Sequence, residues 1–497
     1  MMTKNNTRRA LPVIGLLLFS IITRLYAFKY TYVINNDGVL YLDQAHAILE
    51  GKWDVAKSCG YNFISLYHLL IPVFYKITGD WIVGAKSISL LFGTLAVVPL
   101  YVILRQFLPR AEAFMSGLIF AVNPFFVSNS VELIKDPLFW FIALVGIFFF
   151  LYEPHDKPGD YFMVLSGLSF VAAGFVRFEI IFYMLGSVIY LLSFGENKAK
   201  RTFLFCVPLA GIVMIVLAGL MIHKGNFNIW NIFFAPRINI FFHGFFAGAF
   251  NADLFEKSCD FLKLFTGKFV QSIFFPVIPF VIVGFWSSRK ELLRNRFMRY
   301  AMLLMVLSVM SLYLFYLKFE FLSGRYLATV ILPSFIFIGA GVEKIIPFFE
   351  KKGLRRRTMV LALCFYIIIP ALSANLGDKR TDKLIYKEIG QYISNIENNR
   401  RVNIMAPDKR IMFYANYHTS GLTCAQQLGE YESQIKLTYP DLVAQLKQKN
   451  IHYFLWEERS WENAPYDFLA AAESGVFKKV WQWKTNKTRF IAFKVID

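Results

Sequence analysis

Charged residues are scarce in this sequence of 497 residues. Only 18% of the residues are Asp, Glu, Lys or Arg, whereas 56% are hydrophobic and the mean hydropathy is +0.47. This hydropathy lies well above that of ordinary soluble chains, which carry more charge. The composition therefore argues against a soluble globular protein and predicts a polytopic membrane protein.

Cysteine is also rare, and the spacing of the five cysteines matches no metal or redox motif. The sequence contains no C-x-x-C pair and no zinc-type arrangement. Two of the five lie inside apolar segments. We therefore assign no function to the cysteines, which are Cys59, Cys206, Cys259, Cys364 and Cys424.

Acidic residues are outnumbered, with 34 Asp and Glu against 53 Lys and Arg and a formal net charge of +19. In a soluble protein this excess would suggest nucleic acid, but no soluble module here interleaves basic and aromatic residues. In a membrane protein, Lys and Arg are retained in cytoplasmic loops and attract anionic headgroups. We therefore expect membrane lipids as partners and no nucleic acid.

Long apolar segments occupy most of the first 376 residues. A helix needs about 20 apolar residues to cross a bilayer, and about eleven segments approach this length. They lie near residues 11–31, 82–105, 111–130, 137–152, 161–176, 178–194, 202–222, 270–286, 300–317, 326–346 and 358–376. No small-x-small cleavage site follows the first segment, so we interpret it as an uncleaved anchor.

The loops between these segments are alternately rich and poor in basic residues. Rich loops stay in the cytoplasm, and they lie near residues 105–110, 157, 198–201, 289–299 and 351–357. An odd number of spans then places the N-terminus in the cytoplasm and the C-terminus outside. The outer side receives residues 32–81, 131–136, 223–269, 318–325 and everything after about residue 377.

A change of composition near residue 377 divides the chain into two predicted domains. Residues 1–376 form the transmembrane domain, within which the aromatic-rich residues 223–269 predict interfacial or re-entrant helices. Residues 377–497 predict a C-terminal soluble α/β domain with amphipathic helices at 384–396 and 439–449. Its apolar runs have the length of strands and lie at 402–405, 411–414, 451–456, 477–483 and 489–495.

Acidic residues are nearly absent from the central thirds of the spans, where an ion-coupled transporter usually carries them. Ionisable residues collect instead at the predicted outer ends of the spans. This pattern favours a reaction at the outer leaflet. The residues are Asp37, Asp43, Glu132, Asp136, Arg177, Glu179, Glu320 and Arg325.

Two of these carboxylates also have structural interpretations. Asp37 lies in Asn-Asn-Asp-Gly ahead of apolar residues with helical spacing, where it also fits an N-cap. Asp136 precedes Pro137, an arrangement that is common at a helix start. Because both lie on the same predicted face with Arg177 and Arg325, we interpret the group as a site that holds a base and a phosphate.

Four short stretches, in this order, resemble the GT-C glycosyltransferases. They are the Asp37 loop, residues 132–138 (Glu-Leu-Ile-Lys-Asp-Pro-Leu), residues 177–179 (Arg-Phe-Glu) and residues 323–326 (Ser-Gly-Arg-Tyr). The chain is most similar to the group that includes dolichyl-phosphate-mannose protein mannosyltransferases and bacterial lipid A aminoarabinose transferases. The resemblance covers roughly residues 10–376 and implies a GT-C-like membrane fold.

The resemblance implies transfer of a sugar from a polyprenyl-phosphate donor to a lipid, glycan or protein acceptor, with inversion. Asp37 would act as general base, because an acceptor hydroxyl has a very high pKa. Arg325, with Tyr326, Arg177 and Lys57 nearby, would stabilise the leaving phosphate. Asp136 would help to orient the acceptor or Asp37, or would hold a metal, and Glu132 would contribute to substrate binding. No cofactor is certain, and a divalent metal on Asp37 and Asp136 is possible chemistry.

The chain departs from the family pattern in its first outer loop. The family often has a His-Pro-Pro or Lys-Pro stretch there, whereas residues 58–65 contain no proline. Lys57 and Asn62 are the candidates for donor binding in this stretch. A β-trefoil insert, common in protein mannosyltransferases, is also missing, which favours a bacterial inner-membrane enzyme over a eukaryotic one.

Two other functions are compatible with a polytopic chain. A transporter or flippase of a lipid-linked sugar would predict an internal repeat and polar residues along a midplane path, and the sequence has neither. A non-catalytic receptor or assembly factor would use the C-terminal domain to bind a partner. For such a protein, Asp37→Asn should leave activity in cells intact.

Overall fold

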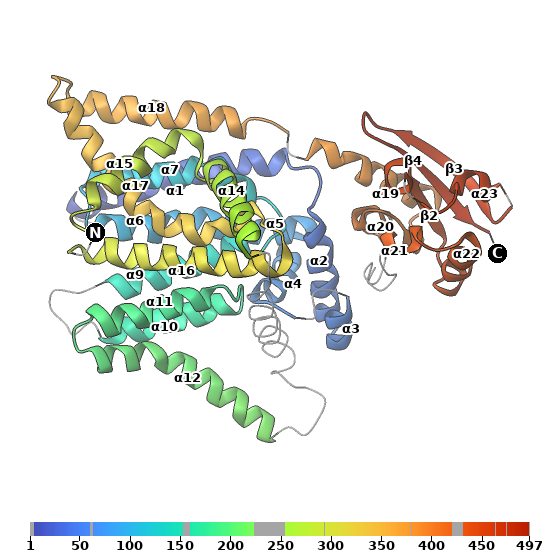
Figure 1. Cartoon of the computed structure of the whole chain (residues 1–497), viewed down its shortest axis with the longest axis horizontal. Coiled ribbons are helices and arrows are strands. Elements are labelled where there is room, and N and C mark those ends of the chain that lie inside the picture. Colours follow the sequence, from blue (N-terminus) through green and yellow to red (C-terminus); the bar gives the residue numbers. More distant parts are fainter. Residues whose placement is uncertain are drawn as a thin grey trace. The chain divides into compact units, whose positions relative to one another are not determined.

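Helices dominate the structure (Figure 1). The computed structural model describes residues 4–59, 63–152, 160–222, 254–292, 294–378, 380–419, 431–462, 464–473 and 475–496. The chain divides into two compact units. The first, called here the membrane unit, contains residues 1–30, 65–67 and 86–377, and the second, called the sheet unit, contains residues 31–64, 68–85 and 378–497.

The membrane unit consists of long helices, many of which lie side by side (Figure 1). The helix α5 begins in the sheet unit and continues into the membrane unit. The elements are α1 (Lys4–Lys29), α5 (Trp81–Leu95), α6 (Val97–Arg105), α7 (Arg110–Val122), α8 (Pro124–Asn129), α9 (Asp136–Leu151), α10 (Asp160–Gly174), α11 (Ile180–Phe194), α12 (Lys198–Ile222), α14 (Leu254–Ile273), η2 (Phe275–Val277), α15 (Ile278–Ser288), α16 (Arg296–Phe319), η3 (Gly324–Leu327), α17 (Ala328–Glu350) and α18 (Arg356–Asn375).

Helices occupy every predicted span within the described part of the chain. Five of these helices are each long and apolar enough to cross a membrane alone, and α9, α10 and α11 are shorter apolar helices. This confirms the prediction of a multi-pass α-helical membrane protein. The five are Ala10–Lys29, Trp81–Arg105, Arg296–Phe319, Gly324–Glu350 and Arg356–Asn375.

The predicted span at residues 270–286 is not one straight helix. The chain bends by 88° between α14 and the helical segment Phe275–Ser288. Phe274 at the bend has a φ of 74°, and Pro276 follows it, so neither residue continues the helix of α14. Of the predicted interfacial pair at 223–269, residues 223–253 lie outside the described residues, and the remainder lies in α14.

The helices α15 and α17 approach so closely that their backbones touch. A Cβ atom added to Gly284 would lie 1.9 Å from the carbonyl oxygen of Phe337, and one added to Gly341 would lie 2.0 Å from that of Phe280. Small residues allow such close contact between membrane helices, where van der Waals packing is a main source of association. One helix of this pair, α17, directly follows η3, which carries two of the predicted site residues.

The sheet unit begins with the predicted outer loop. This loop folds as three helices, α2 (Asn36–Leu49), α3 (Trp53–Ser58) and α4 (Leu66–Thr78). The first residues of α4 belong to the membrane unit.

The rest of the sheet unit is a small α/β domain with the sheet order β1-β2-β4-β3. β1 pairs parallel with β2, and the other pairs are antiparallel. Apolar side chains pack on both faces of the sheet, and the predicted C-terminal α/β domain is thereby confirmed. The elements are η4 (Thr381–Lys383), α19 (Leu384–Ile396), β1 (Ile404–Met405), α20 (Lys409–Ala415), α21 (Tyr431–Ile435), α22 (Tyr439–Gln448), β2 (Tyr453–Glu457), η6 (Glu458–Trp461), α23 (Phe468–Ala472), β3 (Phe477–Lys484) and β4 (Arg489–Val495).

One predicted strand is wrong. Residues 411–414 belong to the helix α20. Asp408 caps this helix, since its carboxylate accepts a hydrogen bond from the backbone N–H of Arg410 at 3.0 Å. An apolar run of four residues fits either a buried strand or a buried helical turn, and the cap decides between them.

Candidate functional site

Three chain breaks meet at one end of the helices of the membrane unit. Asp136 begins α9, Arg177 lies in the short break between α10 and α11, and Tyr326 lies in η3 ahead of α17. These positions are far apart in the sequence, yet Arg177 contacts both of the other side chains. The cluster therefore depends on how the helices pack.

Arg177 bridges two carboxylates. It donates from Nη1 to Asp136 and from Nη2 to Glu179, with a further bond of 3.3 Å from Nε to Glu179 Oε2. Only 5% of the Arg177 side chain and 2% of the Asp136 side chain are exposed, whereas Glu179 is 35% exposed. Glu179 and Arg177 form an ion pair. One guanidinium thus faces two negative charges.

The charge of Arg177 controls the ionisation of Glu179. Burial by itself would raise the pKa of Glu179, but the positive charge and hydrogen bonds of Arg177, with Lys135 nearby, lower it from the ordinary 4.5 to about 2. Burial would likewise lower the pKa of Arg177, and the charges of Asp136 and Glu179 raise it above its ordinary value. Arg177 and Glu179 are therefore both charged at neutral pH.

Two guanidinium groups lie close to the ring of Tyr326. The Arg177 guanidinium carbon is 4.9 Å from the centre of the Tyr326 ring, and that of Arg325 is 5.5 Å from the same ring. Both distances fall within the range of cation–π attraction. The half-buried Arg325 is thus linked through one aromatic ring to the Asp136 cluster.

Two residues that sequence reasoning missed hold the turn ahead of Asp136. The buried hydroxyl of Ser89 donates to the carbonyl oxygen of Ile134 at 2.8 Å. The Tyr67 hydroxyl lies 3.3 Å from the same Ser89 oxygen and is the donor there, because the Ser89 proton is already used. Glu132 lies in this turn and is half-buried. Nothing in the local sequence around Tyr67 or Ser89 signals this contact.

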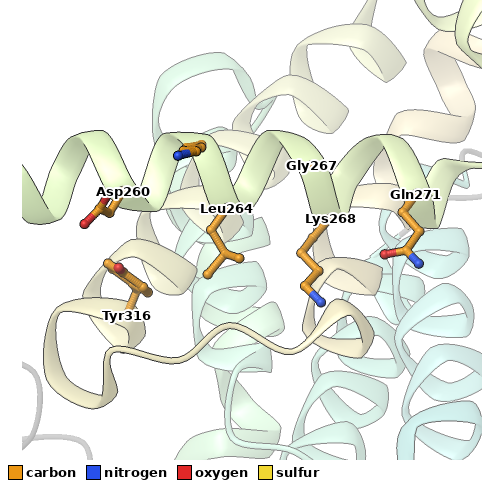
Figure 2. Close-up of a pocket in the computed structure, with 7 residues that line it drawn as sticks. Asp260, Leu264, Gly267, Lys268, Gln271 and Tyr316 are labelled. Atoms are coloured by element: carbon orange, nitrogen blue, oxygen red, sulfur yellow. The ribbon is translucent and has the colours of Figure 1, made fainter.

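A groove on α14 was also missed. Figure 2 shows its lining residues, with Tyr316 of α16 opposite α14 and with Leu264 and Lys268 directed toward the coil that follows α16. The groove has a volume of about 430 Å³ and is lined by Asp260, Lys263, Leu264, Gly267, Lys268, Gln271 and Tyr316. The recurrence of polar residues every three to four positions in α14 is the only sequence signal for it.

Two contacts fix α14 beside α16. Lys257 Nζ donates to Glu320 Oε1 at 2.6 Å, and the Ser258 and Tyr313 hydroxyls are 2.7 Å apart. α14 also packs against η3, the element that carries Arg325. The lysines of the groove and the guanidinium of Arg325 therefore belong to neighbouring elements, which gives this end of the membrane unit several cationic side chains.

The structure places Asp37 in the first turn of α2, in the sheet unit. The cap of this helix is Asn35, whose Oδ1 accepts a hydrogen bond from Gly38 N–H at 2.8 Å. Asp37 is therefore not the N-cap, and its half-buried carboxylate is not needed for that role. Lys57 lies in the last turn of α3, and Asn62 lies outside the described residues. A shared pocket for Asp37 and Asp136 stays a prediction.

Comparison with known proteins gives one family match. The model of the family described as dolichyl-phosphate-mannose-protein mannosyltransferase matches residues 66–223, which include Asp136 and Arg177 but neither Asp37 nor Arg325. No curated protein sequence matches the chain.

Solved structures match nearly the whole chain. ArnT from Cupriavidus metallidurans in the apo state is similar with a TM-score of 0.61 and 12% identity, covering 99% of this chain and 98% of that one. The chain has the GT-C fold. ArnT bound to undecaprenyl phosphate gives the same TM-score and identity, with 98% of each chain covered. The oligosaccharyltransferase AglB from Archaeoglobus fulgidus, in complex with an inhibitory peptide and a dolichol-phosphate, is similar with a TM-score of 0.53 and 11% identity, covering 96% of this chain and 74% of that one.

The GT-C fold alone does not identify a reaction, so the chemistry must be inferred from the side chains of the site. Among the described residues, no group of three or more His, Cys, Asp or Glu side chains is arranged to hold a metal. The cationic groups on α14 and η3 suit an anionic ligand such as a phosphate. Binding of an anion beside a buried carboxylate is what this end of the GT-C fold can do.

One of the five cysteines forms a structural bond. Cys59 is disulfide-bonded, whereas Cys206, Cys259 and Cys364 are free. Cys424 lies outside the described residues.

Proposed function

We propose that the protein transfers a sugar from a polyprenyl-phosphate carrier to an acceptor hydroxyl at the outer face of a bacterial inner membrane. The observation that carries the proposal is the buried ion pair of Asp136 and Arg177, next to Arg325 and a lysine-lined groove in a GT-C fold. ArnT holds undecaprenyl phosphate and AglB holds dolichol-phosphate in their solved structures. These likenesses support a lipid-phosphate donor and a peptide or lipid acceptor.

The proposed reaction is a direct displacement that inverts the sugar's anomeric carbon. The acceptor hydroxyl gives its proton to Asp37 while its oxygen forms a bond to the anomeric carbon. The bond between that carbon and the phosphate oxygen breaks, and its electron pair leaves with the carrier phosphate. A single displacement needs one base and one good leaving group, and no separate nucleophile.

The cationic side chains have different roles in this proposal. Arg177 already faces Asp136 and Glu179, so it holds Asp136 in place rather than serving as the main phosphate ligand. Arg325 and the groove lysine Lys268 stabilise the charge that develops on the leaving phosphate, since cations aimed at a developing charge lower the barrier. Asp136 and Glu132 orient the acceptor, and Tyr326 supports Arg325.

Two observations support an outer-face location. The end of the helices that carries Asp136 is opposite to the basic loops, which remain in the cytoplasm. Cys59, in the sheet unit, is disulfide-bonded, and disulfides persist in oxidising compartments such as the periplasm. The same two features support a location of the sheet unit outside the cytoplasm.

The proposal is tested with protein purified in detergent and a panel of radiolabelled polyprenyl-phosphate sugars. Wild type is compared with Asp37→Asn and with a matched control, Asp54→Asn, which changes an exposed carboxylate in the same unit. Wild type and Asp54→Asn should form labelled product with one donor, and Asp37→Asn should not. Equal product from Asp37→Asn would remove Asp37 from the mechanism. Donor translocation in vesicles without product would favour a flippase.

A further inference from the structure

The backbone just ahead of Asp37 is held by the C-terminal α/β domain. The N–H of Ile34 donates to the Tyr414 hydroxyl oxygen at 3.1 Å, and Arg410 Nη1 donates to the Ile34 carbonyl oxygen at 3.3 Å. Tyr414 and Arg410 both belong to α20. One helix of the C-terminal domain thus satisfies both backbone groups of a single residue in the outer loop.

The two holding side chains are themselves fixed. Arg410 pairs with Asp408 through two hydrogen bonds, from Nε at 2.8 Å and from Nη2 at 2.6 Å. Its guanidinium lies over the Tyr386 ring at 4.9 Å, and Arg410 is only 4% exposed. A planar guanidinium held in this way has little freedom to follow a moving loop. The contact with Ile34 is therefore rigid.

Asp37 lies only three residues after Ile34, so the fixed position of Ile34 restricts Asp37 as well. Ile34 and Asn35 are buried, and Asn35 caps α2 through its bond to Gly38 N–H. Asp37 lies between these two fixed points. A displacement of about 1 Å in a reacting group can cost about 100-fold in rate, so the placement of residues 34–38 matters for a general base.

We propose that Arg410 and Tyr414 are positioning residues that hold the Asp37 loop in the geometry needed for proton transfer. The proposal rests on the role of Asp37 in the proposed function. It assigns the C-terminal domain a part in catalysis, because the outer loop and this domain form one compact unit. On this view, the domain is required for turnover even if it binds no partner.

The chain offers a matched control for this contact. The Tyr417 hydroxyl donates to Asp80 Oδ2 at 2.8 Å, so it too joins the C-terminal domain to the outer loop. Asp80 lies far along that loop from Asp37, just ahead of α5. Tyr414→Phe and Tyr417→Phe each remove one phenolic hydrogen bond between the same parts of the protein. Only the first acts next to Asp37.

The first experiment measures steady-state kinetics of the full-length protein with the donor identified above. Tyr414→Phe should lower kcat between about 10- and 100-fold and leave KM for the donor within about twofold, while Tyr417→Phe should leave both unchanged. Arg410→Lys should restore part of the activity that Arg410→Met loses, because lysine retains a donor for the Ile34 carbonyl and methionine has none. Equal losses of kcat in the two tyrosine variants, or no loss in either, would overturn the proposal.

A second experiment does not depend on activity. Hydrogen–deuterium exchange of the peptide covering residues 34–42 should speed up severalfold in Tyr414→Phe and stay at the wild-type rate in Tyr417→Phe. If Asp37→Asn retains full activity but exchange responds as expected, the role of Asp37 has failed and the contact with Ile34 stands. Unchanged exchange in Tyr414→Phe would show that α20 does not hold the loop.

Discussion

Arg177 and Asp136 lie 41 residues apart in the chain and form an ion pair in which both side chains are almost fully buried. Desolvation makes such a pair costly, and the attraction between the charges offsets that cost only while both partners remain. Arg177 also pairs with Glu179, so its loss would leave two carboxylates without their cation. The cluster is therefore sensitive to single changes.

Arg177→Met should destabilise the protein by about 3–5 kcal/mol, because it leaves a buried, uncompensated charge on Asp136. Thermal unfolding in detergent measures this loss. The double variant Asp136→Asn/Arg177→Met removes both charges and should recover most of the stability but none of the activity. A double variant no more stable than Arg177→Met would contradict this account of the pair.

The lowered pKa of Glu179 predicts a specific acid response. Its pKa lies near 2 when folded and near the ordinary 4.5 when unfolded, so its stabilising effect is complete above about pH 4.5 and is lost as the pH falls toward 2. The Tm difference between wild type and Glu179→Gln should stay constant from pH 7 to about 5 and shrink below that. Parallel Tm curves down to pH 3 would show that Glu179 does not contribute in this way.

Lys268→Ala should weaken donor binding. Hydrogen bonds to charged groups are worth about 1.5–3 kcal/mol, so KM for the donor should rise about tenfold or more. Because the groove is open rather than enclosed, the effect should shrink as salt is added. Lys290→Ala, which changes an exposed lysine at the other end of the helices, serves as the control and should leave KM unchanged. The same KM rise in both variants would argue against phosphate binding in the groove.

Much of the fold could be predicted because helix positions depend on local patterns. Apolar length located the membrane helices, and amphipathic spacing located Leu384–Ile396 at the residues that α19 occupies. The run at 411–414 was misassigned because the cap at Asp408, three residues earlier, outweighs the apolar pattern. The bend at Phe274 depends on a single backbone angle that no pattern reports.

The candidate site was only partly predictable. Asp136, Arg177 and Arg325 could be predicted as site residues from the sequence. Ionisable residues beside membrane spans are costly, so their presence indicates a functional site. The contacts of Tyr67 and Ser89 with the turn ahead of Asp136 could not be predicted, because they join distant segments that no sequence motif connects. The same holds for the contact of Tyr414 with Ile34, 380 residues away. Long-range packing decides these contacts.

The close contact of α15 with α17 predicts a strong effect of one methyl group. Gly284→Ala would place a Cβ atom 1.9 Å from the Phe337 carbonyl oxygen, which is backbone and cannot rotate away. The helices must separate, and overpacking of this kind costs about 1–3 kcal/mol, more than the gain of about 1 kcal/mol from replacing a helical glycine by alanine. A lower Tm in detergent and reduced transferase activity should follow, because α17 carries η3 and Arg325 at its start.

Gly211→Ala supplies the matched comparison for this change. A Cβ atom at Gly211, in α12, meets no atom within 4 Å, so only the helix-propensity term remains. Its Tm should equal or exceed that of wild type, and its activity should be unchanged. If Gly284→Ala behaved like Gly211→Ala, then α15 and α17 would be free to move apart without cost. The position of η3 could then not depend on their contact, and Arg325 would need another support.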